Sequence, residues 1–282
     1  MADRVARTRT VQGGFEGVAV GHDPISNGLL SGKHQYREVA FVASGKARHA
    51  VAAQEYAVWL NEKSPINLTP LNRANENVWR GRYDLVIAGS EEPSGFKDVF
   101  LGNTERELVR YCPSDVLIVR NRPLEPPRRI VVAIAPDPMD DRQTRLASKT
   151  MQAAAAFDDW DDCELNVVNV APSTRYDVLA LNAGFSIDEA KRIEAEARLN
   201  QEYLVYPFLD DLKIRRNRIN LHLLEGNPVQ KITDLVSRLD ADLLVIGSAG
   251  RRGIGRLLIG NTAEKIIRQV ACSYLVTKLV ES

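Results

Sequence analysis

A glycine- and arginine-rich stretch near the C-terminus has the residue types and spacing best suited to binding an anion. It runs from Gly247 to Thr262, with four glycines before Leu257 and three arginines among them. Glycine has no Cβ, so the backbone N–H groups of such a loop can approach a phosphate closely. A helix that begins near Thr262 would add donors and a positive dipole. The stretch therefore predicts a phosphate-binding loop; the alternative is that the glycines merely permit tight turns and the arginines are solvated.

Two well-known phosphate loops do not match this stretch. The pattern GxxxxGK[ST] does not occur in the sequence. Gly253 and Gly255 begin a GxGxxG pattern, but Leu258 stands where the third glycine is required. The sequence therefore excludes a P-loop and a Rossmann dinucleotide fingerprint.

The other candidates for catalysis or metal binding do not form a constellation. Neither the four histidines nor Cys112, Cys163 and Cys272 have metal-ligand spacing, and no serine lies in a GxSxG elbow. An odd number of cysteines without CxxC spacing favours buried thiols in a reducing compartment. We therefore expect no catalytic residue and no metal site, in a cytoplasmic protein.

The composition of the 282 residues narrows the function classes further. Lys plus Arg and Asp plus Glu each number 37, so the chain lacks the overall basic charge typical of nucleic-acid-binding proteins. No apolar run approaches the roughly 18 residues that a membrane span needs. Hydrophobic residues at 44% and charged residues at 26% are ordinary for a globular protein. We expect neither nucleic acid nor a membrane as a partner.

The elements that would position the loop alternate between strands and helices. Four helices are expected, and in the long one Ser186 and Glu189 form a capping box while Ile193, Leu204 and Phe208 share one face. This alternation predicts parallel strands with right-handed crossovers and a ligand crevice at the strands' carboxyl ends, after Ala135, Val170 and Ile246. The predicted strands are Ile130–Ala135, Leu165–Val170, Ile219–Leu224, Asp242–Gly247 and Tyr274–Leu279; the predicted helices are Arg142–Phe157, Ile187–Leu212, Pro228–Leu239 and Thr262–Val270.

An internal repeat shows that the chain contains two related halves. Ten of the 37 positions from Asp84 to Arg120 are identical to those 158 residues further on. Three prolines within 123–127 indicate an extended linker, so we expect domains at 1–122 and 128–282. The fold class is α/β, with two tandem doubly wound domains, each a mainly parallel five-stranded sheet flanked by helices. The first half is predicted to have strands at Gly17–Val20, Glu38–Ala43, Ile66–Leu71, Asp84–Gly89 and Val116–Val119, a helix at Lys46–Glu62 and a loop at His22–Gln35.

The complete loop pattern is Gly-x2-Gly-x9-Gly-Asn, formed by Gly247, Gly250, Gly260 and Asn261. With the strand order and the tandem arrangement, it resembles the nucleotide loop of the universal stress protein family. The chain resembles a two-domain member with a degenerate first copy, since Glu92 replaces the second glycine and would repel phosphate. The resemblance implies an adenine nucleotide alpha hydrolase-like fold.

The resemblance also implies which residues bind a nucleotide. The loop would hold phosphates, Val170 would border adenine, and Ala135 stands where the family has an aspartate that contacts the nucleotide. Asp137 or Asp140 could substitute for that aspartate. The implied nucleotide-binding residues are Gly247, Ser248, Gly250, Arg251, Gly253, Gly260, Asn261, Thr262, Val170, Ala135 and Asp137.

We therefore expect a universal stress protein that binds ATP or a related adenine nucleotide, with or without Mg, in its C-terminal domain. It would act as a stress-response regulator towards unidentified protein partners and would be at most a slow ATPase. The alternative is a nucleotide-independent interaction scaffold with a vestigial loop. The last strand of each half would be a sheet edge that needs a partner, which favours an internal pseudo-dimer and a homodimer.

Overall fold

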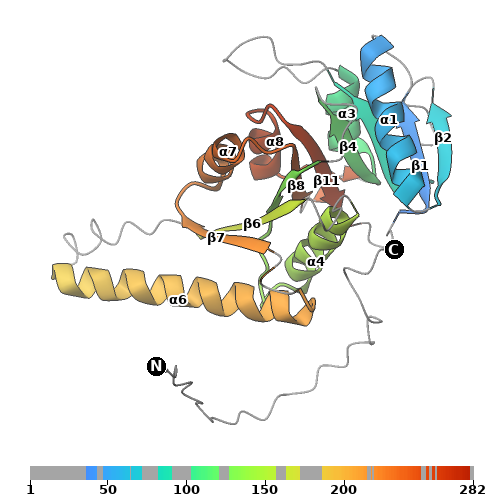
Figure 1. Ribbon diagram of the computed structural model, residues 1–282. Helices are drawn as coiled ribbons and strands as arrows, with labels where there is room; N and C mark the ends of the chain where they lie inside the picture. Colours follow the sequence, from blue (N-terminus) through green and yellow to red (C-terminus); the bar gives the residue numbers. More distant parts are fainter. Residues whose placement is uncertain are drawn as a thin grey trace, which may run out of the picture.

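The computed structural model describes residues 36–42, 47–63, 65–71, 82–90, 103–120, 127–156, 163–171, 186–214, 217, 219–248, 252–253, 256–257 and 259–279. Within them, nine strands form one sheet with the order β2-β1-β3-β4-β11-β8-β5-β6-β7 (Figure 1). A short ribbon of β9 and β10 stands apart. The strands are β1 (Glu38–Val42), β2 (Asn67–Leu71), β3 (Leu85–Gly89), β4 (Asp115–Val119), β5 (Arg129–Ala133), β6 (Glu164–Ala171), β7 (Ile219–Glu225), β8 (Leu243–Ser248), β9 (Arg252–Gly253), β10 (Arg256–Leu257) and β11 (Ser273–Lys278).

The strands pair in parallel within each half of the chain and antiparallel where the halves meet. Strands β1 to β4 form the first half of the sheet, and β5 to β8 with β11 form the second. Only the pairing of β4 with β11 is antiparallel in this sheet of the described residues. The predicted mainly parallel α/β class is confirmed. The predicted strand Gly17–Val20 and the predicted loop His22–Gln35 lie outside the described residues.

Helices cover both faces of the sheet, as a doubly wound fold requires. Ile130 and Val132 of β5 pack in a core with α1, α4 and α6, whereas Val131 and Ala133 face the opposite core with α3, α7 and α8. Successive side chains of a strand point to opposite faces, so one apolar run supplies both cores. The helices are α1 (Ala47–Lys63), α3 (Asn103–Tyr111), α4 (Asp141–Ala155), α6 (Ile187–Asp211), α7 (Pro228–Arg238) and α8 (Asn261–Ile267).

Local sequence signals set the helix starts in the second half. Asp140 caps α4 by accepting hydrogen bonds from the N–H groups of Arg142 and Gln143. Ser186 and Glu189 form the predicted capping box at the start of α6. Asn227 caps α7 in the same manner as Asp140 caps α4. Each cap satisfies backbone donors that have no partner within the helix.

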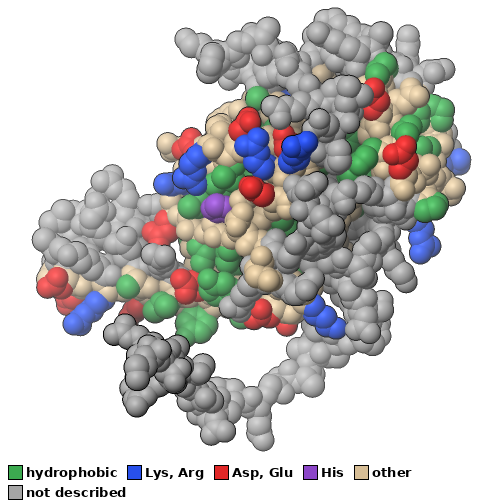
Figure 2. Space-filling view, in the orientation of Figure 1, with side chains coloured by type: hydrophobic (Ala, Val, Ile, Leu, Met, Phe, Trp, Pro, Cys, Tyr) green, Lys and Arg blue, Asp and Glu red, His purple; other side chains and the backbone are tan. Residues whose placement is uncertain are grey.

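The long helix α6 buries Phe208 of the face that the sequence predicts, but not Leu204 of the same face. Its buried residues include Gln201, Val205, Phe208 and Leu212, whereas Leu204 is 41% exposed. Figure 2 shows acidic and basic side chains along the same helix, and Leu199 and Tyr203 are also exposed.

The two halves join through the antiparallel pair of β4 and β11. Leu117 lies opposite Leu275, and these two leucines occupy equivalent positions in the internal repeat. Tyr274 and Val276 flank the pair opposite Ile118 and Val116. The halves are therefore related by an approximate two-fold axis at the leucine pair, and the two predicted edge strands protect each other.

Candidate functional site

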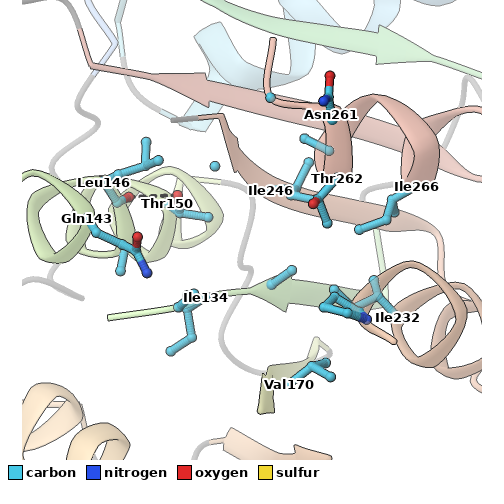
Figure 3. Close-up of a pocket in the computed structure, with 17 residues that line it drawn as sticks. Ile134, Gln143, Leu146, Thr150, Val170, Ile232, Ile246, Asn261, Thr262 and Ile266 are labelled. Carbon is cyan, nitrogen blue, oxygen red and sulfur yellow. Dashed lines mark hydrogen bonds between the residues drawn. The ribbon is translucent and has the colours of Figure 1, made fainter. Parts of the chain in front are cut away.

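A cavity of about 350 Å³ opens where β5, β6 and β8 end (Figure 3). The carboxyl ends of parallel strands are the usual ligand position in an open α/β sheet. Ile134 and Ala135 follow β5, Val170 lies near the end of β6, and Ile246 and Gly247 come from β8. The cavity therefore lies in the crevice that the sequence predicts.

Helix α4 forms one wall of the cavity. Gln143, Leu146, Ala147 and Thr150 line it and recur at helical spacing, so they share one face. Gly247 lies so close to this wall that an added Cβ would be 2.8 Å from the Leu146 Cγ and 2.9 Å from the Thr150 Oγ1. A side chain at position 247 would displace α4, so the close helix–strand approach requires glycine there.

The first turns of α7 together with α8 form the opposite wall. Pro228 and Ile232 come from α7, and Thr262 and Ile266 come from α8. In Figure 3, Thr262 lies between Ile246 and Ile266, whereas the side chain of Asn261 projects away from them. This wall combines apolar side chains with the start of a helix.

The base of the glycine-rich loop is closed by one hydrogen bond. The N–H of Gly260 donates to the Ser248 Oγ over 3.0 Å, and Ser248 is buried. Gly260 is the N-cap of α8, and no described side chain caps that helix. Ser248 thus holds the two ends of the loop together next to the cavity.

The described cavity lining carries no ionised side chain. Its polar side chains are Gln143, Thr150, Asn261 and Thr262. The Thr150 hydroxyl is already engaged, since it donates to the Leu146 carbonyl over 2.7 Å and contacts the Thr277 Oγ1 at 2.7 Å. An apolar, neutral cavity with few free polar groups suits the uncharged body of a ligand.

Six of the residues predicted from the sequence line this cavity together: Ala135, Val170, Gly247, Gly260, Asn261 and Thr262. Gly253 lies in β9 and pairs with Arg256 of β10, away from the described lining. Gly250 and Arg251 lie outside the described residues.

Asp137 and Asp140, the two candidates for a carboxylate at the cavity, are engaged elsewhere. The Asp137 Oδ1 accepts the Met139 N–H over 2.9 Å, and the Asp137 backbone bonds the Thr144 side chain. Asp140 is committed to the cap of α4. Neither residue lies in the described lining, so a ligand contact by Asp137 would require this turn to rearrange.

Sequence reasoning missed the walls supplied by α4 and α7. Gln143 is the main omission because its side-chain amide is one of the few polar groups in a largely apolar cavity. Its position in the first turn of the helix after β5, which ends at the crevice, is a signal that could have identified it. Ile232 occupies a similar position on α7, in the helix that leads into β8.

The first half has a buried carboxylate where the second half has a cavity wall. Glu105 is the repeat equivalent of Ala263, which lines the cavity. The Glu105 carboxylate accepts hydrogen bonds from Ser90 at 2.6 Å, from Arg120 at 2.8 Å and from Tyr274. Burial and the neighbouring Glu105 raise the pKa of Tyr274 well above its usual value. A position that lines the cavity in the second half is thus occupied by a buried carboxylate in the first.

Two of the cysteines, Cys112 and Cys272, are poor nucleophiles. Burial raises the pKa of Cys112, and burial raises the pKa of Cys272 to about 12. A thiol with such a pKa stays protonated near neutral pH and does not react readily.

No group of three His, Cys, Asp or Glu side chains in the described ranges is arranged to hold a metal ion. None of the helices there has the length and hydropathy of a membrane span.

Comparison with known proteins places these features in one family. The profile of the Universal stress protein family matches residues 127–278, which is more than half of the chain. A Universal stress protein E homolog of Haemophilus influenzae is 25% identical over 251 residues, covering 87% of this chain and 76% of the relative. Universal stress protein E of Escherichia coli is 25% identical over 241 residues, covering 82% and 74%.

Solved structures share the fold at lower sequence identity. A universal stress protein from Archaeoglobus fulgidus has a TM-score of 0.53 at 15% identity, over 85% of this chain and 98% of that one. A functionally unknown protein from Pseudomonas aeruginosa has a TM-score of 0.56 at 19% identity, over 92% and 90%. The sheet order, the cavity at the strand ends and the match over the whole second half lead to one conclusion: the chain belongs to the universal stress protein family.

Proposed function

We propose that the protein binds ATP or a related adenine nucleotide in the cavity of its second half, and that it regulates a stress response through protein partners. The cavity between β5, β8 and α4 carries this proposal, because its volume of about 350 Å³ lies in the range of small-ligand sites. The nucleotide would lie with its base in the apolar part and its phosphates towards Gly260. The proposed site residues are the six predicted ones that line the cavity, the loop residues Gly250 and Arg251, and Gln143.

The apolar walls suit a purine ring. Ile134, Val170 and Ile232 line the apolar part of the cavity (Figure 3). Ligand pockets are lined mostly by apolar side chains, and a few polar groups set the orientation of the ligand. Gln143 supplies such a group, since its amide can both donate and accept hydrogen bonds.

The rim formed by Gly247, Gly260 and Thr262 suits a phosphate. Glycine at 260 leaves open space, because an added Cβ would meet nothing within 4 Å. Backbone donors can therefore approach an anion there without steric hindrance. The arginines of the loop at 251, 252 and 256 would add positive charge nearby.

The chemistry of the lining favours binding over catalysis. The described lining has no ionised side chain that could activate water or stabilise the charge of a phosphoryl-transfer transition state. We therefore propose a nucleotide-dependent switch in the cytoplasm that is at most a slow ATPase. An association of two chains would extend the internal pseudo-dimer.

Mass spectrometry of the freshly purified protein would identify any retained nucleotide, and calorimetric titration with ATP, with and without Mg, would measure affinity. Ala263→Glu copies Glu105 of the first half and should abolish binding by placing a carboxylate in the cavity. Ala271→Glu is the matched control, since Ala271 is exposed outside the cavity lining. Gly250→Glu copies Glu92 and should act like Ala263→Glu. Equal ATP affinity in all four proteins would refute a site in this cavity.

One observation favours the second candidate function, a scaffold that needs no nucleotide. Ala135 brings no carboxylate to the cavity, and the Asp137 carboxylate is held in its turn. A scaffold would show no retained nucleotide and no heat of binding with ATP. Its partners would then bind the wild type and the Ala263→Glu variant equally well.

A further inference from the structure

Helix α4 lies between the cavity and the junction of the two halves. Its residues Leu146 and Thr150 line the cavity (Figure 3), while Lys149, the neighbour of Thr150, contacts the first half of the chain. The same helix packs on β8 and β11, the strands nearest the junction. The position of α4 therefore affects both the cavity and the junction.

Lys149 binds the first half through a buried carboxylate. Its Nζ donates to the Asp115 Oδ1 over 2.7 Å and to the Lys278 carbonyl over 2.6 Å. The Asp115 side chain is completely buried, whereas that of Lys149 is 28% exposed. A buried carboxylate depends strongly on its partners, so the Asp115 charge ties Lys149 to one position.

Asp115 also connects several elements of the first half to this contact. Its Oδ1 accepts the Lys278 N–H over 2.9 Å, and its Oδ2 accepts the Tyr36 hydroxyl over 3.0 Å. Asp115 begins β4, and Tyr36 lies two residues before the start of β1. A change at Asp115 therefore acts directly on two neighbouring parts of the first half.

The cavity side of α4 is equally constrained. Thr150 contacts Thr277 of β11, and the close approach of Gly247 leaves no room for α4 to move towards β8. A ligand in the cavity would press on the face that carries Leu146 and Thr150. Closely packed interfaces do not deform continuously. A ligand that shifts the face of α4 with Leu146 and Thr150 would therefore also shift Lys149 on the adjacent face of the helix.

We propose that nucleotide in the cavity and the Lys149–Asp115 contact stabilise each other through α4, so that Lys149 is the positioning residue by which the second half acts on the first. This inference rests on the proposed function. Coupling of this kind is reciprocal: if the ligand strengthens the contact, the contact strengthens ligand binding by the same factor. Nucleotide binding in the second half then acts directly on the degenerate first half of the chain.

The test combines calorimetry with hydrogen exchange, using ATP as the probe and the full chain throughout. In the wild type, ATP should slow amide exchange in β1 and β4 of the first half as well as in α4. Lys149→Met should bind ATP at least about fivefold more weakly, the lower end of typical coupling, and should lose the slowing in β1 and β4. Lys149→Arg should restore both effects. Arg145→Met is the matched control, because Arg145 is an exposed cation one turn earlier on α4.

A second variant separates coupling from simple loss of stability. Lys149→Met leaves Asp115 buried without its cation, whereas Lys149→Met with Asp115→Asn removes both charges. The asparagine oxygen can still accept the Lys278 N–H, and its NH2 group can donate to the Tyr36 hydroxyl oxygen. The double variant should fold as stably as the wild type within measurement and still lack the ATP effect on β1 and β4. Return of that effect in the double variant would show that the unpaired charge was responsible and would overturn the assignment.

The remaining outcomes distinguish this inference from the proposed function. If the wild type binds ATP and exchange in β1 and β4 does not change, the coupling is wrong and the nucleotide site stands. If Lys149→Met and Arg145→Met weaken ATP binding equally, Lys149 has no special role. If the wild type does not bind ATP at all, the nucleotide site and the coupling to it both fail.

Discussion

Arg120 and Lys278 occupy equivalent positions of the internal repeat, and each reaches across the junction to a backbone carbonyl of the other half. The Arg120 Nη1 donates to the Val270 carbonyl over 2.6 Å, and the Lys278 Nζ donates to the Cys112 carbonyl. Cys112 and Val270 are themselves repeat equivalents, 158 residues apart. The two-fold relation at the junction is thus preserved in its contacts although the residue types have changed.

The partners of these two cations differ, which makes the junction asymmetric. Arg120 pairs with Glu105 and stacks on the Tyr274 ring, with 4.8 Å between the guanidinium carbon and the ring centroid. Lys278 has no ion pair with a residue that the structure describes; its backbone N–H donates to Asp115, which also binds Lys149. One side of the junction is therefore a buried ion pair, and the other side connects to the cavity through α4.

Removal of Glu105 should destabilise the protein strongly. Glu105→Ala leaves the fully buried Arg120 guanidinium without its counter-charge, and breaking a buried pair in this way costs about 3–5 kcal/mol. Urea unfolding followed by circular dichroism measures the change. Arg268→Ala, which removes a partly exposed pair with Glu264 on α8, should cost less than about 1 kcal/mol. Similar losses in the two variants would contradict the importance of the buried pair.

The glycines at the two ends of the loop should respond differently to alanine. Gly247→Ala forces a Cβ against Leu146 and Thr150, which should cost about 1–3 kcal/mol of stability and disturb the α4 wall. Gly260→Ala has open space and a φ of −67°, so stability should change by less than about 1 kcal/mol.

ATP titration of the same two variants extends this prediction to binding. The Cβ that Gly260→Ala adds would occupy the rim where we place the phosphates. The variant should therefore bind ATP more weakly, while its free energy of unfolding stays close to that of the wild type. Unchanged affinity in Gly260→Ala would argue that phosphate does not approach that rim.

A carboxylate at position 135 should strengthen nucleotide binding. Ala135→Asp places an acceptor at the mouth of the cavity, and a charged hydrogen bond to a ribose hydroxyl contributes about 1.5 kcal/mol or more, roughly tenfold in affinity. Asp137→Ala is the informative comparison. The turn that holds the Asp137 carboxylate predicts little change in ATP affinity, and a large loss would show that Asp137 leaves the turn to bind ligand.

Stability should depend on pH through Lys278. Burial lowers the pKa of Lys278 to about 8 from 10.5, with Cys112, Asp115 and Lys149 as its charged or titratable neighbours. Between these two values the unfolded chain binds the proton that the folded protein has released, so this group's contribution to stability rises with pH in that window and is constant below about 8.

Comparison with Lys278→Met separates the contribution of Lys278 to the pH dependence of stability from that of other titratable groups. The buried thiol of Cys272 acts in the opposite sense, because its raised pKa keeps a proton in the folded state that the unfolded state loses. The stability of the wild type minus that of Lys278→Met should therefore increase between about pH 8 and 10.5, at a slope of up to roughly 1.4 kcal/mol per pH unit. A flat difference would mean that Lys278 is protonated in the folded protein throughout.

Much of the second half could be predicted from local sequence signals. The capping box at Ser186 and the helix start at Pro228 depend on neighbouring residues alone, so both appear where the sequence places them. The crevice followed from parallel pairing, and Val170 and Gly260 accordingly meet in one cavity although they lie 90 residues apart. The internal repeat likewise predicted that the last strands would share a partner.

Other features depended on which surfaces meet, and the amino-acid sequence determined them only through the complete fold. Three features depend on how separate elements lie relative to one another, which no local sequence pattern specifies. They are the exposure of Leu204, the position of Gln143 in the cavity wall, and the contact of Lys149 with Asp115. Periodicity identifies the apolar face of a helix but not how far the sheet extends beneath it. The sequence by itself determined the family fold and the strand ends at which the cavity opens. The tertiary structure decided which helix lines that site and connects it to the other half, because packing depends on the shapes of both surfaces.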